Sequence, residues 1–389
     1  MRIHPPHGKT GACCVLASAT VAVIAFFALG IADGSSVSAQ AAPVITPVGP
    51  ITNLAARPYG ALLPIVVGPA NTPTAAPTPT PVATATPTPP PGAVPAPTPP
   101  ASPREAAALY HSEYLPALST DAQSTANVAN CSPGTISAPR LAALEKQINY
   151  FRRMAGVPLI SFDATMSAHA QAAALIMAAE GSLSHDPPTT WRCYSADGAT
   201  GAGRSDLGLS GGYDTRRSVI TFMQDPGSSN VAMGHREWLL APPTRLMGAG
   251  EVQGSEWDAY AVHVVDPGAP YFDPWPAPRD GFVAWPPPGF VPRDVVYPRW
   301  SFFLAADFGA ASIALRLDGN PVASTIIYAE SGSTESAVPG WNGLVWEPAL
   351  DLEGLDWSTT HRVDVTIREV KPDDGATRAY DYAVLLFAP

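Results

Sequence analysis

This chain is poor in charged residues and in cysteine, and it has fewer basic than acidic residues. Only 14% of its residues are charged, and 22 Lys and Arg stand against 33 Asp and Glu, for a formal net charge of -11. A surface that binds the phosphates of nucleic acid needs clustered positive charge. The composition therefore argues against nucleic acid as a partner.

Complete signatures of hydrolases are also missing. No Gly-x-Ser-x-Gly turn lies near His185 or His235, and there is no His-Glu-x-x-His helix. Several serines lie near His185 along the chain, namely Ser182, Ser184, Ser195 and Ser205. Closeness in sequence does not give the hydroxyl-to-imidazole geometry that a nucleophile needs.

Two of the four cysteines, Cys13 and Cys14, lie in an apolar run over residues 12–32, after a basic start and before Val37-Ser38-Ala39. This is the pattern of a secretory signal. The run is also about as long as the ~20 residues that span a bilayer, so an uncleaved anchor that tethers the chain to the membrane is the alternative. We therefore expect residues 1–39 to be a signal peptide or membrane anchor, and the rest to be extracellular or on the cell surface.

The other two cysteines, Cys131 and Cys193, form an even pair in a chain predicted to be exported. One disulfide is the simplest interpretation, and two separate buried thiols are the alternative. The disulfide would close a loop of 62 residues (193 minus 131).

Residues 40–104 are rich in Pro and Thr, with repeats such as Pro77-Thr78-Pro79-Thr80-Pro81. Such a segment cannot bury a core and is expected to be a disordered, extended linker. Residues 105–136 are Ala-rich and predict a helical lead-in segment.

Helical and strand patterns follow over residues 137–270. Leu141, Leu144, Ile148 and Phe151 predict one face of an amphipathic helix. The other side is expected to hold Arg140, Glu145, Lys146, Arg152 and Arg153. Further helices are expected from Asp163 to Gly181, over 215–223 behind Asp214, and over 231–240, followed by a hairpin of strands 248–252 and 259–265. The pattern predicts an α+β layer domain.

Residues 271–298 form a connector rich in Pro and aromatic residues, and residues 299–389 alternate apolar and polar side chains. Ile313, Leu315 and Leu317 are one example of this period of two. We expect an all-β sandwich there.

Two stretches, Gly181-Ser182-Leu183-Ser184-His185 and Gly234-His235-Arg236, each place a histidine at the edge of a predicted helix. A helix with Asn149 and Arg153 precedes them, and the Gly248-Ala249-Gly250 strand follows. As an ordered set they resemble the bacterial branch of the CAP superfamily, the cysteine-rich secretory, antigen 5 and pathogenesis-related 1 proteins (SCP domain). The C-terminal part resembles the immunoglobulin-like module that often follows such domains.

The resemblance implies a cleft lined by two histidines and up to two acids. His185 and His235 match the histidines. Arg204 stands where the family has a glutamate, with Asp206 two places later as a shifted substitute. Phe222 stands at a tryptophan position, and Asp225, three residues on, replaces a glutamate.

Two imidazoles and two carboxylates are ligands for zinc or a similar divalent ion, so His185 and His235 are candidate metal ligands. Arg204 would weaken such a site by its charge, or pair with Asp206 or Asp225. The resemblance implies an extracellular binding module for a lipid, glycan, other small molecule or protein. The alternative is a metal-assisted or serine-type hydrolase of peptides or cell-wall polymers.

Overall fold

The structure is a computed structural model that describes residues 96–389, except 212–214, 272–275, 333–336, 339 and 374. The predicted signal or anchor, the linker up to residue 95 and the cap candidate Asp214 lie outside the described residues. All described residues belong to one compact unit, Ile45–Pro389. No helix among them is both long and apolar enough to span a membrane.

The N-terminal part of the described chain is mostly helical. Its helices are α1 (Pro103–Leu109), η1 (Tyr110–Tyr114), α2 (Pro116–Ser119), η2 (Val128–Asn130), α3 (Ala138–Met154), α4 (Ala164–Glu180), α5 (Ala196–Ala202), η3 (Thr215–Arg217), α6 (Ser218–Gln224) and α7 (Gly234–Leu239). Its strands are β1 (Ser161–Phe162), β2 (Ser205–Ser210), β3 (Leu246–Gln253) and β4 (Asp258–His263), in the sheet order β1-β3-β4-β2. Asp163 caps α4 by accepting from the Met166 amide, and Gly181 ends it at φ +70°.

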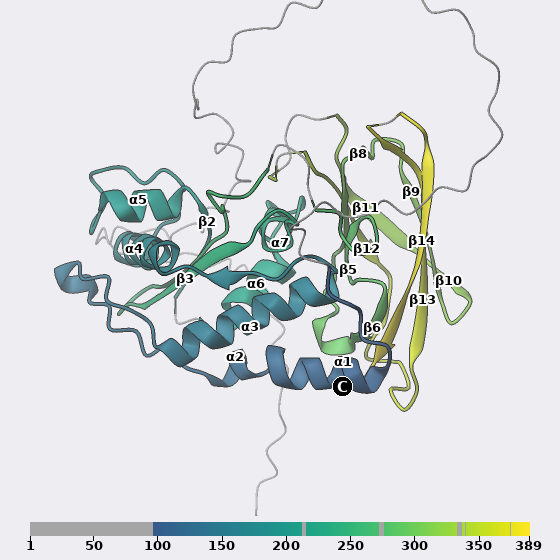
Figure 1. The fold of residues 1–389 in the computed structure, drawn as a ribbon, viewed down its shortest axis with the longest axis horizontal. Helices are drawn as coiled ribbons and strands as arrows, with labels where there is room; N and C mark the ends of the chain where they lie inside the picture. The colour runs from purple at the N-terminus through teal and green to yellow at the C-terminus, as the bar shows by residue number, and fades with distance from the viewer. Residues whose placement is uncertain (1–95, 212–214, 272–275, 333–336, 339, 374) are drawn as a thin grey trace, which may run out of the picture. The chain divides into compact units, whose positions relative to one another are not determined.

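The sheet lies between two layers of helices, with α4 and α5 over one face and α3 and α6 over the other (Figure 1). Close packing of α4 depends on the two glycines of β3. A Cβ on Gly248 would lie 2.3 Å from the Ser167 amide nitrogen, and one on Gly250 would lie 2.3 Å from that of Gln171. The Gly-x-Gly strand is therefore required by the approach of α4 to the sheet.

The face of α3 differs from the prediction at two positions. Arg140 and Arg152, expected on the solvent side, are both 0% exposed. Arg140 makes a two-point ion pair with buried Glu251 through Nε (2.9 Å) and Nη2 (2.7 Å). Arg152 donates to backbone carbonyls, including those of Leu239 at 2.7 Å and Ala241 at 3.0 Å. The prediction of an exposed charged face was wrong there because both guanidinium groups find buried acceptors.

The C-terminal part is a sandwich of two sheets, as expected. Its strands are β5 (Val283–Trp285), β6 (Gly289–Pro292), β7 (Trp300–Leu304), β8 (Ala306–Asp307), β9 (Ser312–Leu317), β10 (Asn320–Val322), β11 (Ser324–Ala329), β12 (Asn342–Pro348), β13 (His361–Pro372) and β14 (Arg378–Phe387); the short helix η4 is Arg293–Val295. One sheet has the order β10-β9-β13-β14-β6, with β8 beside β13, and the other β11-β12-β7-β5. The fold class is therefore confirmed as α+β followed by a β-sandwich.

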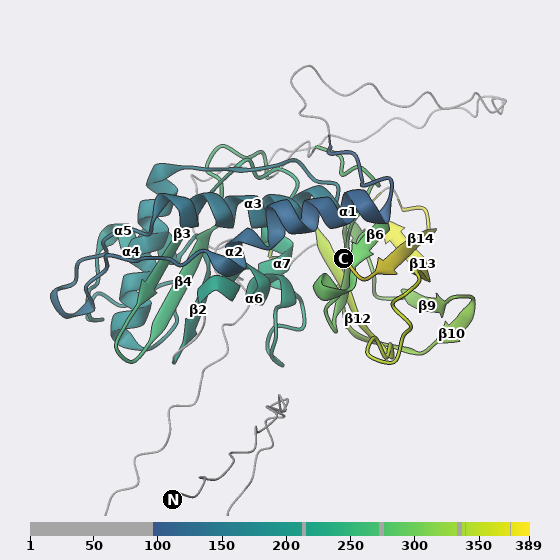
Figure 2. The same cartoon turned by 90° about the horizontal axis from the view of Figure 1, so that it is seen from below.

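The expected connector contributes to the sandwich. Residues 283–292, placed in the connector by composition, form β5 and β6, and β6 pairs in parallel with β14. The lead-in segment also contacts this region, since Tyr110 donates to Asp294 at 3.0 Å. Figure 2 shows α1 beside α3 in the turned view, and η1, which follows α1 directly, packs on α3. One continuous set of buried apolar side chains runs from α3 through α7 into the sandwich.

Candidate functional site

His235 and Asp225 form a buried pair on the α6–α7 side of the sheet. Asp225 ends α6 and is 1% exposed, and His235, the second residue of α7, is 8% exposed. The carboxylate of Asp225 lies 2.7 Å from His235 Nδ1 and also accepts from the His235 amide at 3.1 Å. Asp225 thus fixes both the backbone and the ring of His235 and leaves Nε2 as the nitrogen facing away from it.

Asp206 lies near this pair, from the second position of β2. It is paired in register with Val262 of β4, so its side chain shares the sheet face of Val262 and Tyr260. Asp206 is 0% exposed, and neither carboxyl oxygen has a hydrogen-bond partner among the described residues. Burial raises its pKa well above 3.8; the charge of Asp225 adds to this and that of His235 opposes it.

His185 approaches from the loop after α4. Its Nδ1 lies 2.8 Å from the carbonyl oxygen of Ala202, and its Nε2 is buried without a partner in the described structure. Burial lowers its pKa below 6.5, the Ala202 carbonyl opposes this, and the charge of His235 lowers it further. His185 is therefore neutral near pH 7, with its proton on Nδ1 and a free lone pair on Nε2.

We refer to His185, Asp206, Asp225 and His235 as the His–Asp cluster. Two imidazoles are held through Nδ1, one by a carbonyl and one by a carboxylate. Neither Nε2 atom, nor the carboxyl group of Asp206, has a hydrogen-bond partner among the described residues. Histidines that bind metals are held in this way through their second nitrogen. Within the described residues, however, no group of three or more His, Cys, Asp or Glu side chains is arranged to hold a metal ion. Imidazole nitrogens and carboxylate oxygens are nonetheless ligands of the kind that zinc takes in proteins.

Arg204 is not paired with either acid of the cluster in the described structure. Its backbone carbonyl accepts from Val264 at 3.0 Å, and its charge acts on His263, whose pKa is lowered to about 4 by burial, His169 and Arg204. His263 is 1% exposed, and its ring stacks on that of His169 at 5.9 Å between centroids. His263 is paired in register with Ser205, and Asp206 is the next residue of the same strand. Neighbouring residues of a strand point to opposite faces of the sheet, so the His169–His263 pair lies on the opposite face from Asp206.

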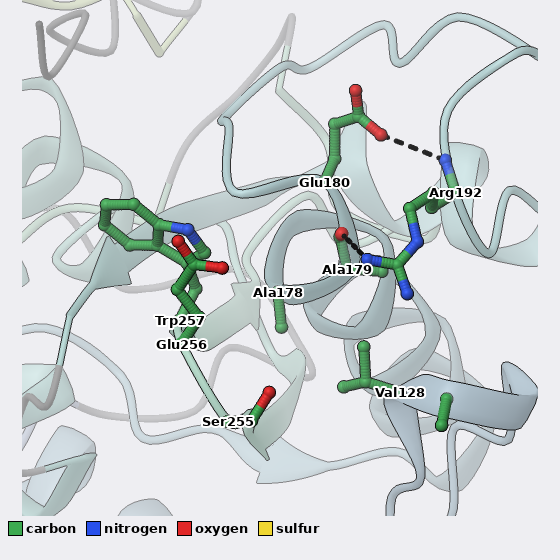
Figure 3. A pocket seen from close by; sticks show the side chains of 9 residues that line it. Val128, Ala178, Ala179, Glu180, Arg192, Ser255, Glu256 and Trp257 are labelled. Carbon is green, nitrogen blue, oxygen red and sulfur yellow. Dashed lines mark hydrogen bonds between the residues drawn. The ribbon is translucent and has the colours of Figure 1, made fainter. Parts of the chain in front are cut away.

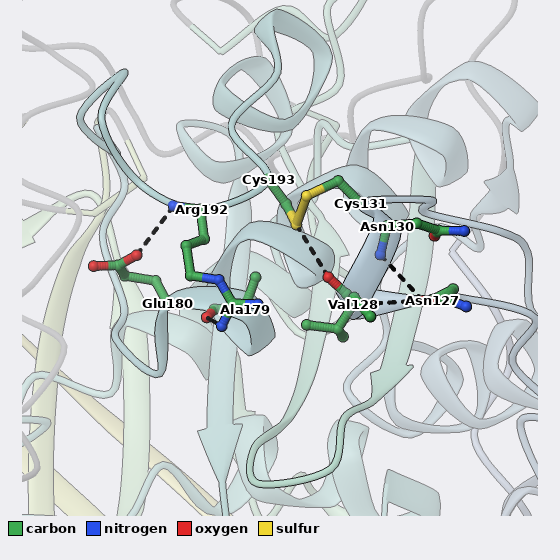
Figure 4. Close-up of a disulfide and its surroundings, with 9 residues drawn as sticks. Asn127, Val128, Asn130, Cys131, Ala179, Glu180, Arg192 and Cys193 are labelled. Carbon is green, nitrogen blue, oxygen red and sulfur yellow. Dashed lines mark hydrogen bonds between the residues drawn. A yellow bond between two sulfur atoms is a disulfide. The ribbon is translucent and has the colours of Figure 1, made fainter.

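The predicted disulfide between Cys131 and Cys193 is present (Figure 4). It links η2 to the loop that follows His185. Beside it is a surface hollow of about 400 Å³ lined by Val128, Ala129, Ala178, Ala179, Glu180, Arg192, Ser255, Glu256 and Trp257 (Figure 3). Arg192 is fixed at its edge by donating to the Ala179 carbonyl at 3.0 Å. No member of the His–Asp cluster lines this hollow, so it is separate from the predicted site.

The family resemblance places Asp225 in the cleft but predicts no contact between Asp225 and His235. Asp225 ends α6 and His235 lies ten residues later at the start of α7, so no helical or strand periodicity predicts that the two side chains meet. The family resemblance was the only feature of the sequence that assigned Asp225 to the cleft. The buried Arg140–Glu251 pair was not anticipated as a pair.

The Asp225–His235 pair predicts a pH-dependent stability. Burial alone would lower the pKa of His235, but the charge and hydrogen bond of Asp225, with the charge of Asp206, raise it from 6.5 to about 9. The folded state therefore holds this proton more tightly than the unfolded chain. The resulting stability is complete below pH 6.5 and is lost as the pH rises through about 9.

We expect the free energy of unfolding of wild type to exceed that of Asp225→Asn most at about pH 6. The difference should shrink by about 3 kcal/mol on going to pH 10, as the shift in pKa implies. Urea unfolding in a chelator measures it. Asp364→Asn is the control, because Asp364 is a partly exposed residue of β13 that pairs with Arg362, and this variant should show no such pH trend. A constant difference between wild type and Asp225→Asn would contradict the assigned ion pair.

The first domain matches one family model of known proteins. Residues 146–265 match the family model CAP, described as the cysteine-rich secretory protein family. No curated protein matches the chain. Among solved structures, an outer surface protein from Borrelia burgdorferi is 17% identical, with 31% of this chain and 86% of that chain covered and a TM-score of 0.23. An extracellular protein containing a SCP domain from Bacillus anthracis str. Ames is 16% identical, with 34% and 45% covered and a TM-score of 0.24.

Proposed function

Residues 146–265 carry a domain of the cysteine-rich secretory protein (CAP) family, and on that premise we propose that this protein is an exported binding module that takes up its ligand at the His–Asp cluster. The family name, the predicted N-terminal signal and the Pro/Thr-rich linker support a location outside the cytoplasm. The resemblance implies a lipid, glycan or protein ligand.

One observation carries the proposal. His185 Nε2, His235 Nε2 and both oxygens of Asp206 are buried and lack hydrogen-bond partners within the described structure. Each buried polar group without a partner costs about 1–3 kcal/mol. Three such side chains that act on one another electrostatically form a group that a ligand would satisfy together.

A zinc-like divalent ion is the first ligand that we propose, held by His185 Nε2 and His235 Nε2. When bound, it would supply positive charge and open coordination positions for water or an oxygen of a larger ligand. Asp225 would keep the His235 ring in place and make Nε2 a stronger donor. Because His235 holds its proton up to about pH 9, the ion must displace that proton, and affinity should rise with pH.

The hydrolase alternative gains no support from the serines near the cluster. In the described structure, Ser184 Oγ accepts from the Asp186 amide and Ser195 Oγ from the Gly198 amide, which caps α5. Ser205 faces the opposite side of the sheet from Asp206. No serine hydroxyl is hydrogen-bonded to His185 or His235 among the contacts of the described residues. Binding is therefore the function that we propose.

Zinc should stabilise the wild-type protein against heat, because an ion that binds only the folded state raises the free energy of unfolding. The increase is about 2.7 kcal/mol at a free zinc concentration 100 times the Kd. His185→Gln and His235→Gln should each lose most of this increase. Thermal unfolding with buffered zinc, at about pH 7 and pH 8.5, measures it, and the effect should be larger at the higher pH.

His111→Gln is the matched control, since His111 is exposed and lies on η1, outside the cluster. It should respond to zinc as wild type does. Equal stabilisation of the double variant His185→Gln/His235→Gln would show that zinc binds elsewhere. Absence of any effect on wild type would eliminate the metal part of the proposal.

A further inference from the structure

The arginine of the Gly-His-Arg segment has no role in the proposed site, yet it is among the most buried side chains of the protein. Arg236 follows His235 on α7 and is 0% exposed. Its Nε donates to the Met223 carbonyl at 2.6 Å. Its Nη1 donates to the Arg299 carbonyl at 2.9 Å and to Ser301 Oγ at 3.0 Å. Arg236 therefore joins the helix that carries His235 to the start of sandwich strand β7.

A second arginine makes the reverse connection. Arg299 lies immediately before β7, and its Nη1 donates to the carbonyl oxygens of Asp225 at 3.1 Å and Asn230 at 3.3 Å. Its Nε donates to Glu347 of β12 at 3.3 Å, so the guanidinium is also anchored within the sandwich. Each domain thus inserts an arginine into backbone carbonyls of the other. We call Arg236 and Arg299 the arginine clamp.

The clamp holds a loop that has an unusual backbone. Asp225 and Met233, at its two ends, adopt φ +48° and +59°, a left-handed conformation that non-glycine residues rarely adopt. Such conformations persist where surrounding contacts hold them. Arg299 binds the carbonyl of Asp225, whose carboxylate in turn holds the ring and amide of His235. Two hydrogen bonds therefore connect the sandwich to the His235 ring, one from Arg299 to Asp225 and one between Asp225 and His235.

A third contact joins α7 to the sandwich independently of the arginines. The amide of Val338 donates to Glu237 Oε1 at 3.2 Å, and both groups are buried. Glu237 follows Arg236 on α7, so consecutive residues of this short helix bind the C-terminal domain. The helix has only six residues, and such a helix has little stability of its own.

From these contacts we propose that the C-terminal sandwich completes the ligand site, and that Arg299 is a positioning residue that sets the orientation of Asp225 and hence of His235. The sandwich then has a role in binding beyond that of an appended module. The consequence for ligand affinity rests on the proposed function, whereas the orientation of His235 can be measured without any ligand.

The test is Arg299→Ala in the full chain, with Arg362→Ala as the matched control. Arg362 is an exposed sandwich arginine paired with Asp364. In Arg299→Ala, we expect the affinity for zinc to fall about tenfold, the size of effect found when groups that orient a metal-binding histidine are lost. In histidine labelled with ¹⁵N, the ring signals of His235 should shift while those of His185 stay in place. Arg299→Lys, which keeps the charge but not the fork of donors, should show a smaller change.

Three results separate the possibilities. Unchanged ¹⁵N signals of His235 in Arg299→Ala would overturn the proposal that Arg299 positions His235. Equal changes of His185 and His235, with a matching loss of thermal stability, would show general loosening and would overturn the positioning role as well. If wild type does not bind zinc, the metal proposal fails, and the ¹⁵N signals of His235 still decide whether Arg299 positions it.

Discussion

Replacing Glu251 by Gln is expected to destabilise the protein by about 3–5 kcal/mol, the cost of leaving a buried charge without its partner. Glu251 is 1% exposed and Arg140 is 0% exposed, so water cannot take over when the carboxylate is removed. The carboxylate of Glu251 accepts two charge-assisted hydrogen bonds from Arg140 and a third from Ser218 Oγ at 3.0 Å. Glutamine keeps only one acceptor oxygen, carries no charge and places an amide donor against the guanidinium donors. Urea unfolding at about pH 7 measures the change.

The control for this prediction is Glu113→Gln, because Glu113 also faces an arginine of α3. Its pair with Arg153 spans 3.3 Å and both side chains are partly exposed, at 20% and 28%. Such pairs contribute about 0–1 kcal/mol, so the control should unfold close to wild type. Similar losses in the two variants would mean that burial does not set the strength of the Arg140–Glu251 pair.

Removing the disulfide with Cys131→Ser/Cys193→Ser is expected to cost about 4 kcal/mol. The bond closes a segment of 62 residues, and restricting the unfolded chain over that length gives this magnitude. The closed segment contains α3, α4 and His185. We therefore expect the double variant also to bind zinc more weakly, because the loop that carries His185 loses its attachment to η2.

Wild type treated with a reductant serves as the independent comparison for the double variant. Both should unfold at the same lower urea concentration, and the oxidised wild type at a higher one. Identical midpoints for oxidised and reduced wild type would contradict a stabilising disulfide. Tighter zinc binding by the double variant would contradict the support that we assign to the His185 loop.

The apolar patterns predicted most of the fold. The stripe of Leu144, Ile148 and Phe151 placed α3, and the cap residue Asp163 with the terminator Gly181 gave both ends of α4. The alternating strands of the sandwich were also clear from sequence, since β-strands show a period of two. The CAP resemblance over the first domain is confirmed for residues 146–265.

Elements stabilised by tertiary packing were missed. Helix α5 contains Gly198 and Gly201, which disfavour a helix in isolation. A Cβ on Gly201 would lie 2.1 Å from the His169 carbonyl oxygen, so the glycine is needed where α5 packs on α4. Strand β2 was likewise not predicted, and its pairing with β4 is what places Asp206 on its sheet face.

The buried arginines were missed for a different reason. Arg140 lies four residues before Leu144 and eight before Ile148, so it shares their side of the helix. The expectation of an exposed Arg140 followed from its charge and not from its place on the apolar side of the helix. A guanidinium group can be buried when its donors are satisfied. The contacts that Arg236 and Arg299 make between the two domains join residues 63 to 74 positions apart and leave no local pattern in the sequence.

The place of β14 in its sheet has a consequence for how the sandwich assembles. β14 lies between β13 and β6. Its pairing with β13 joins two strands that follow each other along the chain, whereas its pairing with β6 joins Val384 to Gly289, 95 positions away (384 minus 289). Bringing such distant segments together costs more loop-closure entropy than forming a hairpin, so the β14–β6 edge is expected to be the slower part of this sheet to form.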